Sequence, residues 1–327
     1  MTSESTPQAD VNRKNKPVIQ YDEVVCTLFE GGYHFGVAAL INSIVKGGYR
    51  GLFWVGYRGD LPPWLAGLQR DENGLYLVGN AILGFELLDS DVHFTHFKPV
   101  FMKSLIDRGI AVSRLWYFDP DITVRCNWDF YRRWVKFGIC VCQEYSMGTM
   151  PSRHPIRCEW IESARNAGWG EPIHELERYF NAGFLGLQVQ RVEFLDTWAA
   201  ANDLARSLGV DQAQFYTGSR ANTFQFADQD AMNIAAMYSK EPLSPIGPEG
   251  MGWVTGGFTM YHTVGGKKPW KKKFLLSSLS ADPPWNGDRH FLESVDGPLR
   301  PYSGFRLRMM RFSADLANLI GRFYVRR

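Results

Sequence analysis

The sequence predicts an α/β protein built on an open, mostly parallel sheet that is flanked by helices. Three observations lead to this prediction: a strand–helix–strand pattern near the N-terminus, further alternation of the two element types, and an ordinary globular composition. Of the 327 residues, 45% are hydrophobic and 21% are charged. These values exclude disordered, collagen-like and coiled-coil classes. No uninterrupted apolar run reaches the roughly 18 residues that a membrane span needs.

The first predicted unit covers residues 21–57. Residues 21–29 are mostly apolar and β-branched, which predicts a buried strand. After Gly31 and Gly32, residues 33–45 place apolar side chains at helical spacing, and two further glycines end this helix. A second buried strand is expected over residues 51–57. Such a βαβ unit implies parallel strands and a fold that is compatible with nucleotide binding.

The same alternation continues along the chain. Helices are expected over residues 98–107, 129–137, 193–207 and 228–238, and strands over residues 111–118, 139–142 and 184–189. Residues 242–250 are rich in Pro and Gly, so we expect turns there. The predicted organisation is a disordered leader over residues 1–17, one α/β domain over residues 18–275, and a basic, helical extension over residues 276–327.

The two ends of the chain have distinct compositions. Residues 1–17 are polar and lack the apolar core of a signal peptide, so we expect a cytoplasmic protein. The five cysteines lack the spacing of a disulfide framework or a zinc site. Residues 251–327 contain 13 Lys or Arg against five Asp or Glu, whereas the rest of the chain is acidic. This charge asymmetry predicts an anionic partner near the C-terminal end.

The C-terminal segment 303–327 mixes arginines with large apolar residues, which predicts a basic amphipathic helix. Two interpretations stay open: a solvated helix face, and a helix that lies on an anionic membrane surface. The second would make the protein peripheral at the inner face of the membrane. Nucleic-acid binding is disfavoured because the sequence contains no nucleic-acid motif and the main body is acidic.

A pair of carboxylates, Asp119 and Asp121, directly follows the predicted strand 111–118. Side chains two positions apart in an extended segment face the same way, so both can converge on one divalent cation. Ligands of open α/β sheets also gather at the carboxyl ends of strands. The alternative is a turn at the strand end, with Pro120 at its second position.

A second polar motif lies far along the chain, over residues 262–270, and has the pattern His-x-x-Gly-x-x-Lys-Pro-Trp. The imidazole of His262 would be a suitable nitrogen ligand for Mn²⁺. Gly265 would allow the backbone to approach a phosphate, and Lys268 would supply a positive charge. Together with the two carboxylates, this motif provides the parts of a metal–diphosphate site.

Four sequence blocks in this order resemble those of a retaining GT-A-fold glycosyltransferase family, glycosyltransferase family 8, which includes glycogenin and bacterial lipopolysaccharide galactosyltransferases. The blocks are Asp119-Pro120-Asp121, residues 180–183 (Phe-Asn-Ala-Gly), residues 228–230 (Asp-Gln-Asp) with Asn233, and residues 262–270. The resemblance covers roughly residues 22–275. It implies a GT-A-like fold and a catalytic domain that binds a nucleotide sugar.

The resemblance also implies a role for individual residues. Asp119, Asp121 and His262 would hold the metal, and Gly265 and Lys268 would contact the diphosphate. The donor sugar would be surrounded by Asn181, Gly183 and the two residues nearest the reacting carbon, Asp228 and Gln229. A basic residue about one helix before the carboxylate pair would face the donor; Lys103 fits this spacing best, and Lys98 is the second choice. Thr27 and Tyr33 would meet the nucleoside, although Glu30-Gly31-Gly32 departs from the family pattern.

The implied activity is transfer of a hexose from a nucleotide diphosphate sugar, most simply a UDP-sugar, to a hydroxyl of a glycan or lipid-linked acceptor. Mn²⁺ or Mg²⁺ would assist, and the anomeric configuration would be retained. Retention is compatible with front-face attack or with a covalent intermediate; we favour the front-face route, because the amide of Gln229 is a poor nucleophile. Two alternative functions stay open: a nucleotidyltransferase on a similar fold, and a non-catalytic protein that binds sugar nucleotides or glycans.

Overall fold

The structure is a computed structural model of the chain and describes residues 19–146, 149–215, 223–257 and 259–323. The expected leader over residues 1–17 lies outside the described residues. The last four residues of the expected C-terminal helix lie outside them as well.

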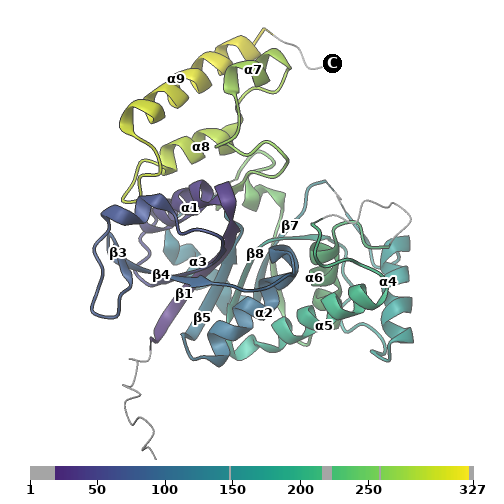
Figure 1. The fold of residues 1–327 in the computed structure, drawn as a ribbon. Coiled ribbons are helices and arrows are strands. Elements are labelled where there is room, and N and C mark those ends of the chain that lie inside the picture. The colour runs from purple at the N-terminus through teal and green to yellow at the C-terminus, as the bar shows by residue number, and fades with distance from the viewer. Residues whose placement is uncertain (1–18, 147–148, 216–222, 258, 324–327) are drawn as a thin grey trace, which may run out of the picture.

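The described residues form one large mixed sheet and one small sheet (Figure 1). The large sheet has the strand order β3-β4-β2-β1-β5-β8-β7-β9, with four parallel and three antiparallel pairings. Its strands are β1 (Tyr21–Glu30), β2 (Leu52–Arg58), β3 (Tyr76–Val78), β4 (Ala81–Leu87), β5 (Ala111–Phe118), β7 (Ile139–Gln143), β8 (Phe180–Gln188) and β9 (Leu243–Ile246). The small sheet pairs β6 (Ile122–Val124) with β10 (Met260–His262) in antiparallel orientation.

Helices cover both faces of the large sheet. They are α1 (His34–Lys46), α2 (Phe94–Asp107), α3 (Trp128–Trp134), α4 (Pro155–Asn166), α5 (Glu193–Ser207), α6 (Ala227–Tyr238), α7 (Phe274–Leu279), α8 (Asn286–Ser294) and α9 (Gly304–Gly321). Short 3₁₀ helices lie at Gly31–Tyr33, Pro63–Gly67, Val135–Phe137, Val189–Arg191 and Pro248–Met251. The α/β class predicted from the sequence is thereby confirmed.

The central strand β1 is buried on both faces, as the near-continuous apolar run predicts. Val24 and Leu28 point into a core formed with α2, α5 and α6. Val25 and Phe29 point into a second core, formed with α1 and α3. Burial on both sides fixes the register of β1, because a slip of one residue would exchange the two sets of side chains. This central strand ends at the edge where the polar residues predicted for the site gather.

Several regions differ from the predicted elements. Residues 242–250, expected to be turns, contain the edge strand β9, which pairs in parallel with β7. Pro245 is tolerated there because β9 lies at the edge of the sheet, where a missing N–H disrupts no central pairing. Strand β8 begins at Phe180 rather than at residue 184, so it includes the Phe-Asn-Ala-Gly block. Strands β3, β4, β6 and β10 and helix α4 were not predicted.

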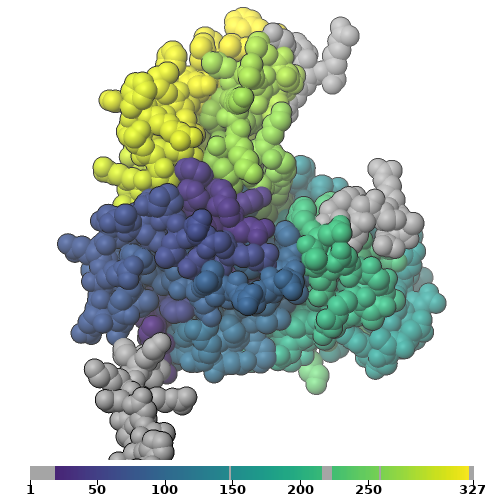
Figure 2. Space-filling model, viewed as in Figure 1, coloured from purple at the N-terminus to yellow at the C-terminus, as the bar shows by residue number. Residues whose placement is uncertain are grey.

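The three C-terminal helices form a separate hydrophobic cluster against α1. Phe291 of α8 and Leu307 of α9 are buried in this cluster, together with Ala39 of α1. Figure 2 shows α7–α9 as a yellow and light-green lobe that stands on the purple α1 region. Among the described residues, none of the helices is both long enough and apolar enough to cross a membrane.

Candidate functional site

A cavity of about 650 Å³ opens at the carboxyl ends of β1 and β5. Most of the residues predicted for the site line it: Tyr33, Asp119, Asp121, Asn181, Gly183, Asp228, Gln229, His262, Gly265 and Lys268. Because β8 lies next to β5 in the sheet, the Phe-Asn-Ala-Gly block lies beside the carboxylate pair. The fold therefore brings four distant sequence blocks to one cavity.

Asp119, Asp121 and His262 form the polar centre of this cavity. One ligand atom from each residue lies within 4.8 Å of the other two. His262 Nε2 is 3.3 Å from Asp121 Oδ1 and 3.8 Å from Asp119 Oδ2. The pairing of β10 with β6 sets His262 opposite Ile122, directly after Asp121. The small antiparallel sheet thus positions the imidazole.

Two neighbours hold the imidazole of His262 in this place. Trp253 stacks on it with ring centroids 5.6 Å apart, and its indole Nε1 donates a hydrogen bond to the His262 carbonyl at 3.0 Å. A Cβ atom at Gly183 would lie 2.4 Å from His262 Cε1 and 3.0 Å from Asp119 Oδ2. Only glycine at position 183 leaves room for the imidazole beside the two carboxylates.

Lys268 forms an ion pair with Asp121 and also donates a hydrogen bond to the carbonyl of Thr263 at 3.0 Å. Burial alone would raise the pKa of Asp121, but the charge of Lys268 and the contact with His262 outweigh it and hold that pKa well below its ordinary value. Asp121 is therefore an ionised carboxylate at neutral pH. This is the protonation state that a cation ligand needs.

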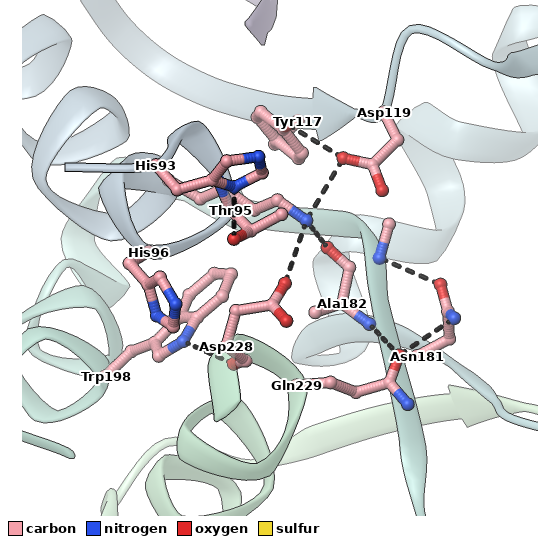
Figure 3. Close-up of polar contacts among 12 residues, drawn as sticks. His93, Thr95, His96, Tyr117, Asp119, Asn181, Ala182, Trp198, Asp228 and Gln229 are labelled. Carbon is pink, nitrogen blue, oxygen red and sulfur yellow. Dashed lines mark hydrogen bonds and ion pairs between the residues drawn. The ribbon is translucent and has the colours of Figure 1, made fainter. Parts of the chain in front are cut away.

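Lys98, on α2, is a buried ammonium that reaches two carboxylates. Its Nζ lies 3.0 Å from Asp119 Oδ1 and 3.4 Å from Asp228 Oδ2, and it donates to the Ala182 carbonyl at 3.0 Å. Asp119, Asp228 and Ala182 converge on this point in Figure 3. Burial would lower the pKa of Lys98, but the two carboxylates outweigh it and raise the pKa, so the ammonium stays charged.

A network of side-chain amides lies beside this ion cluster, and Asn181 and Gln229 are adjacent in it (Figure 3). Asn181 Nδ2 donates to Gln229 Oε1 at 2.9 Å and to Glu144 Oε2 at 2.7 Å. Gln229 Oε1 also accepts from the backbone N–H of Ala182 at 3.2 Å. These bonds fix the orientation of both amides at the cavity wall.

The start of α6 is fastened to β8 by side chains that do not line the cavity. Asn233 exchanges two hydrogen bonds with the backbone of Phe180, each at 2.8 Å. Asp230 accepts from the Tyr179 hydroxyl at 2.6 Å and from two backbone N–H groups before α6. Asp230 therefore has a capping role, whereas Asp228 and Gln229 face the cavity.

Two predicted residues lie outside the cavity. Lys103 is on the outer face of α2, where it pairs with Asp107 at 3.2 Å and Asp196 at 3.4 Å. Lys98 takes its place, because residues five apart in a helix point about 140° away from each other. Thr27 is 2% exposed and lies within β1, which continues to Glu30; Leu28, Phe29 and Glu30 line the cavity instead.

Glu144 is a cavity residue that the sequence interpretation missed. It is buried, and its Oε1 accepts from the backbone N–H groups of Tyr145 and Ser146 at 2.9 and 3.1 Å. The available signal was its position directly after β7, equivalent to that of the carboxylate pair after β5. Without a motif around it, this acidic residue resembled any loop carboxylate.

Comparison with known proteins supports the fold. No family model matches the chain, and no curated protein matches it. Among solved structures, the bifunctional glycosyltransferase WbbM is similar with a TM-score of 0.52 and 17% identity, over 90% of this chain and 52% of WbbM. The chain therefore spans about half the length of WbbM.

Two further glycosyltransferase structures are similar at lower scores. GlyE from Streptococcus pneumoniae has a TM-score of 0.49 and 13% identity, over 90% of this chain and 64% of GlyE. The galactosyltransferase LgtC, in complex with donor and acceptor sugar analogs, has a TM-score of 0.48 and 13% identity, over 88% of this chain and 99% of LgtC. The similarity to WbbM shows that the chain has the GT-A-like fold that the sequence resemblance predicts.

Proposed function

We propose that this chain is a glycosyltransferase that moves a hexose from a nucleoside diphosphate sugar to a hydroxyl group of an acceptor. The observation that carries the proposal is the convergence of Asp119, Asp121 and His262 at one end of a 650 Å³ cavity. Lys98 and Lys268 add two ammonium groups to the same cavity wall. Carboxylates, imidazole and ammonium groups together suit a cation and a diphosphate better than they suit a neutral ligand.

The donor set fits a hard or borderline divalent cation such as Mn²⁺ or Mg²⁺. Two carboxylates and one imidazole present oxygen and nitrogen atoms within 4.8 Å of one another, and the absence of a side chain at Gly183 leaves room for the imidazole beside the carboxylates. Asp119, Asp121 and His262 would hold the cation. When bound, such a cation neutralises the negative charge that develops on a departing diphosphate.

The two lysines would act on the diphosphate and the donor sugar. Lys268 lies beside Asp121 and lines the cavity, so its ammonium would pair with a phosphate of the donor. Lys98 is held between Asp119 and Asp228 and fixes the orientation of both carboxylates. Such preorganised positive charge stabilises a transition state without the cost of reorganising solvent.

Donor-sugar hydroxyls would be oriented by Asn181, Asp228 and Gln229. Their side chains are already fixed by hydrogen bonds or ion pairs, which lowers the entropy cost of holding the anomeric carbon in place. Gly265 has φ +99° and no neighbour within 4 Å of a Cβ position, so its backbone is open to a phosphate. Tyr33 would meet the nucleoside at the end of β1.

Retention of configuration is part of the proposal. Gln229 Oε1 is occupied by two hydrogen bonds, and an amide oxygen is a weak nucleophile. Asp228 is paired with Lys98. Neither residue is prepared as a nucleophile, so we favour front-face attack, in which an oxygen of the leaving diphosphate takes the acceptor proton.

A thermal-shift panel of UDP-, GDP- and CDP-sugars with Mn²⁺ tests the donor class. The nucleotide series that stabilises the folded protein identifies the base of the donor. Analysis of the products then separates the alternatives: a glycosyltransferase releases a nucleoside diphosphate, and a nucleotidyltransferase releases pyrophosphate. A non-catalytic binding protein would be stabilised by the nucleotide sugar but would release neither product.

We also propose a domain organisation in which residues 18–275 form the catalytic domain. The C-terminal helices would hold this domain on an anionic membrane surface. Six large apolar side chains of this segment are exposed at intervals of three and four residues: Phe305, Met309, Phe312, Leu316, Leu319 and Phe323. This spacing gathers the first five on one face of α9, and Phe323 follows two residues after the helix ends. Arg306 and Arg308 flank that apolar face, and their charge complements anionic lipid. A lipid-linked acceptor would be reached from this position.

A further inference from the structure

A second groove, of about 680 Å³, lies between the loop 252–257 and the start of α8. We refer to it as the aromatic groove, because Trp253, Tyr261 and Trp285 line it together with Arg125 and Asn286. Tyr261 and Trp285 meet edge to face with ring centroids 6.1 Å apart. None of these residues is among the three proposed cation ligands.

The loop that forms one wall of the groove depends on glycine. Gly252 has φ +74°, and a Cβ atom there would lie 2.2 Å from Tyr261 Cδ1. Gly257 accepts a hydrogen bond from Arg125 Nη1 at 2.7 Å, which holds the loop against β6. The groove is thus shaped by close backbone approach and by a specific polar contact, rather than left by loose packing.

Trp253 connects the aromatic groove to the proposed active site. Trp253 lines the groove, and its ring also stacks on His262. The same ring lies 5.1 Å from the ring of Tyr145, a residue that lines the first cavity. The two recesses therefore share a wall. A chain-like ligand that occupies the groove would lie close to the reaction centre.

The groove carries a positive charge. Among the described residues, Arg125 Nη1 donates to two uncharged oxygens, the Gly257 carbonyl and the Tyr261 hydroxyl, at 2.7 and 3.1 Å. None of the described residues that line the groove is acidic. The guanidinium is thus available to an anionic group, such as a carboxylate or phosphate.

We propose that the aromatic groove binds an acidic saccharide, meaning one that bears carboxylate or phosphate groups. The partly exposed indole rings of Trp253 and Trp285 would pack against the apolar faces of sugar rings, and Arg125 would pair with the acidic substituent. The choice of a saccharide as the ligand rests on the proposed function. If the chain transfers a sugar to a glycan, the groove would bind the part of the acceptor that extends beyond the hydroxyl group receiving the sugar. The requirement for negative charge rests on Arg125 alone.

The test is calorimetric titration of the full chain in EDTA, without donor, using trigalacturonate, neutral galactotriose and inorganic phosphate as probes. We expect trigalacturonate to bind at least about tenfold more tightly than galactotriose, and phosphate alone to bind weakly. Arg125→Gln should remove this preference. Arg50→Gln, which removes an equal charge at an exposed position, should preserve it.

A second variant tests the same charge preference while keeping Arg125, whose hydrogen bond to Gly257 holds the loop 252–257 in place. Asn286→Asp adds a negative charge at an exposed lining residue, and it should weaken trigalacturonate binding by about tenfold while leaving galactotriose binding unchanged. Equal affinities for the two saccharides, or no binding of either, would overturn the inference. Because the titration contains neither metal nor donor, its outcome is independent of whether the chain transfers a sugar.

Discussion

Lys98 Nζ lies 3.0 Å from Oδ1 of Asp119, and this contact links the middle of α2 to the carboxylate pair at the end of β5. The ammonium is 2% exposed and also touches Asp228. A charged group that is removed from water so completely is stable only when it is paired, and here it has two partners. The contact therefore holds together three of the sequence segments that line the cavity.

Replacement of Lys98 by Met should abolish function and reduce stability. Asp119 and Asp228 would face each other without a counter-charge, so we expect the free energy of unfolding to fall by about 3–5 kcal/mol. The rate of transfer should fall by at least about 100-fold. Lys103→Met is the matched control, since its exposed ion pairs contribute less than about 1 kcal/mol. Equal activity of the two variants would refute the role of Lys98.

Gly183→Ala should weaken cation binding without unfolding the protein. The added Cβ would lie 2.4 Å from His262 Cε1, so the imidazole must move away from the carboxylates. We expect the affinity for Mn²⁺, measured by electron paramagnetic resonance, to fall by about 10- to 100-fold. Gly304→Ala, where nothing lies within 4 Å of the new Cβ, should leave this affinity unchanged. Normal Mn²⁺ binding by Gly183→Ala would mean that His262 is not a ligand.

The stability of the fold should depend on pH through His290. Burial and the charges of Lys46 and Arg125 lower the pKa of this imidazole to about 4; the ring also contacts Tyr261, and its Nδ1 lies 2.8 Å from the Thr123 hydroxyl. Below pH 6.5, the unfolded chain takes up a proton that the folded chain excludes until about pH 4. Stability should therefore fall with decreasing pH across this window, by up to about 3 kcal/mol.

His290→Gln should remove this contribution. The measurement is the difference in unfolding free energy between the original chain and the variant, from urea titrations at several pH values between 4 and 7. We expect the difference to shrink as the pH falls. A difference that stays constant would show that His290 has the same pKa in the folded and unfolded states.

The exposed apolar face of α9 should bind anionic membranes. Phe312→Glu places a negative charge at a side chain that is 63% exposed, so the fold should persist while binding to phosphatidylglycerol vesicles is lost. Phe137→Glu, at a phenylalanine that is 72% exposed elsewhere, is the matched control. Cosedimentation with anionic and neutral vesicles measures both variants. If Phe312→Glu instead splits a dimer and no vesicles are bound, the face pairs two copies of the chain.

The central strands were predictable because β1, β2 and β5 each contain a run of mostly apolar residues that is buried in the sheet. The short strands β3 and β9 were not predictable, because three or four residues are too few to establish a strand periodicity in the sequence. Tertiary pairing with β4 and β7 makes them strands. Such pairing depends on contacts far apart in the sequence.

Site residues that belong to a sequence motif were predicted correctly. Site residues were missed where their position depends on which way an element faces in the fold. The carboxylate pair and His262 belong to recognisable blocks, and the structure brings them together. The choice between Lys98 and Lys103 depends on which face of α2 meets the sheet, and the helix begins at Phe94 rather than at residue 98. Glu144 belongs to no motif, and only the neighbouring position of β7 and β8 places it at the cavity.

The most direct measurement of the central claim is the stoichiometry of Mn²⁺ binding in the presence of UDP, determined by calorimetry on the original chain and on two variants. We predict one Mn²⁺ per chain for the original protein, and at least about 100-fold weaker binding for Asp121→Asn and for His262→Ala, with both variants folded by circular dichroism. Undiminished binding by both folded variants, or no Mn²⁺ bound by the original chain, would contradict the assignment of a shared cation site.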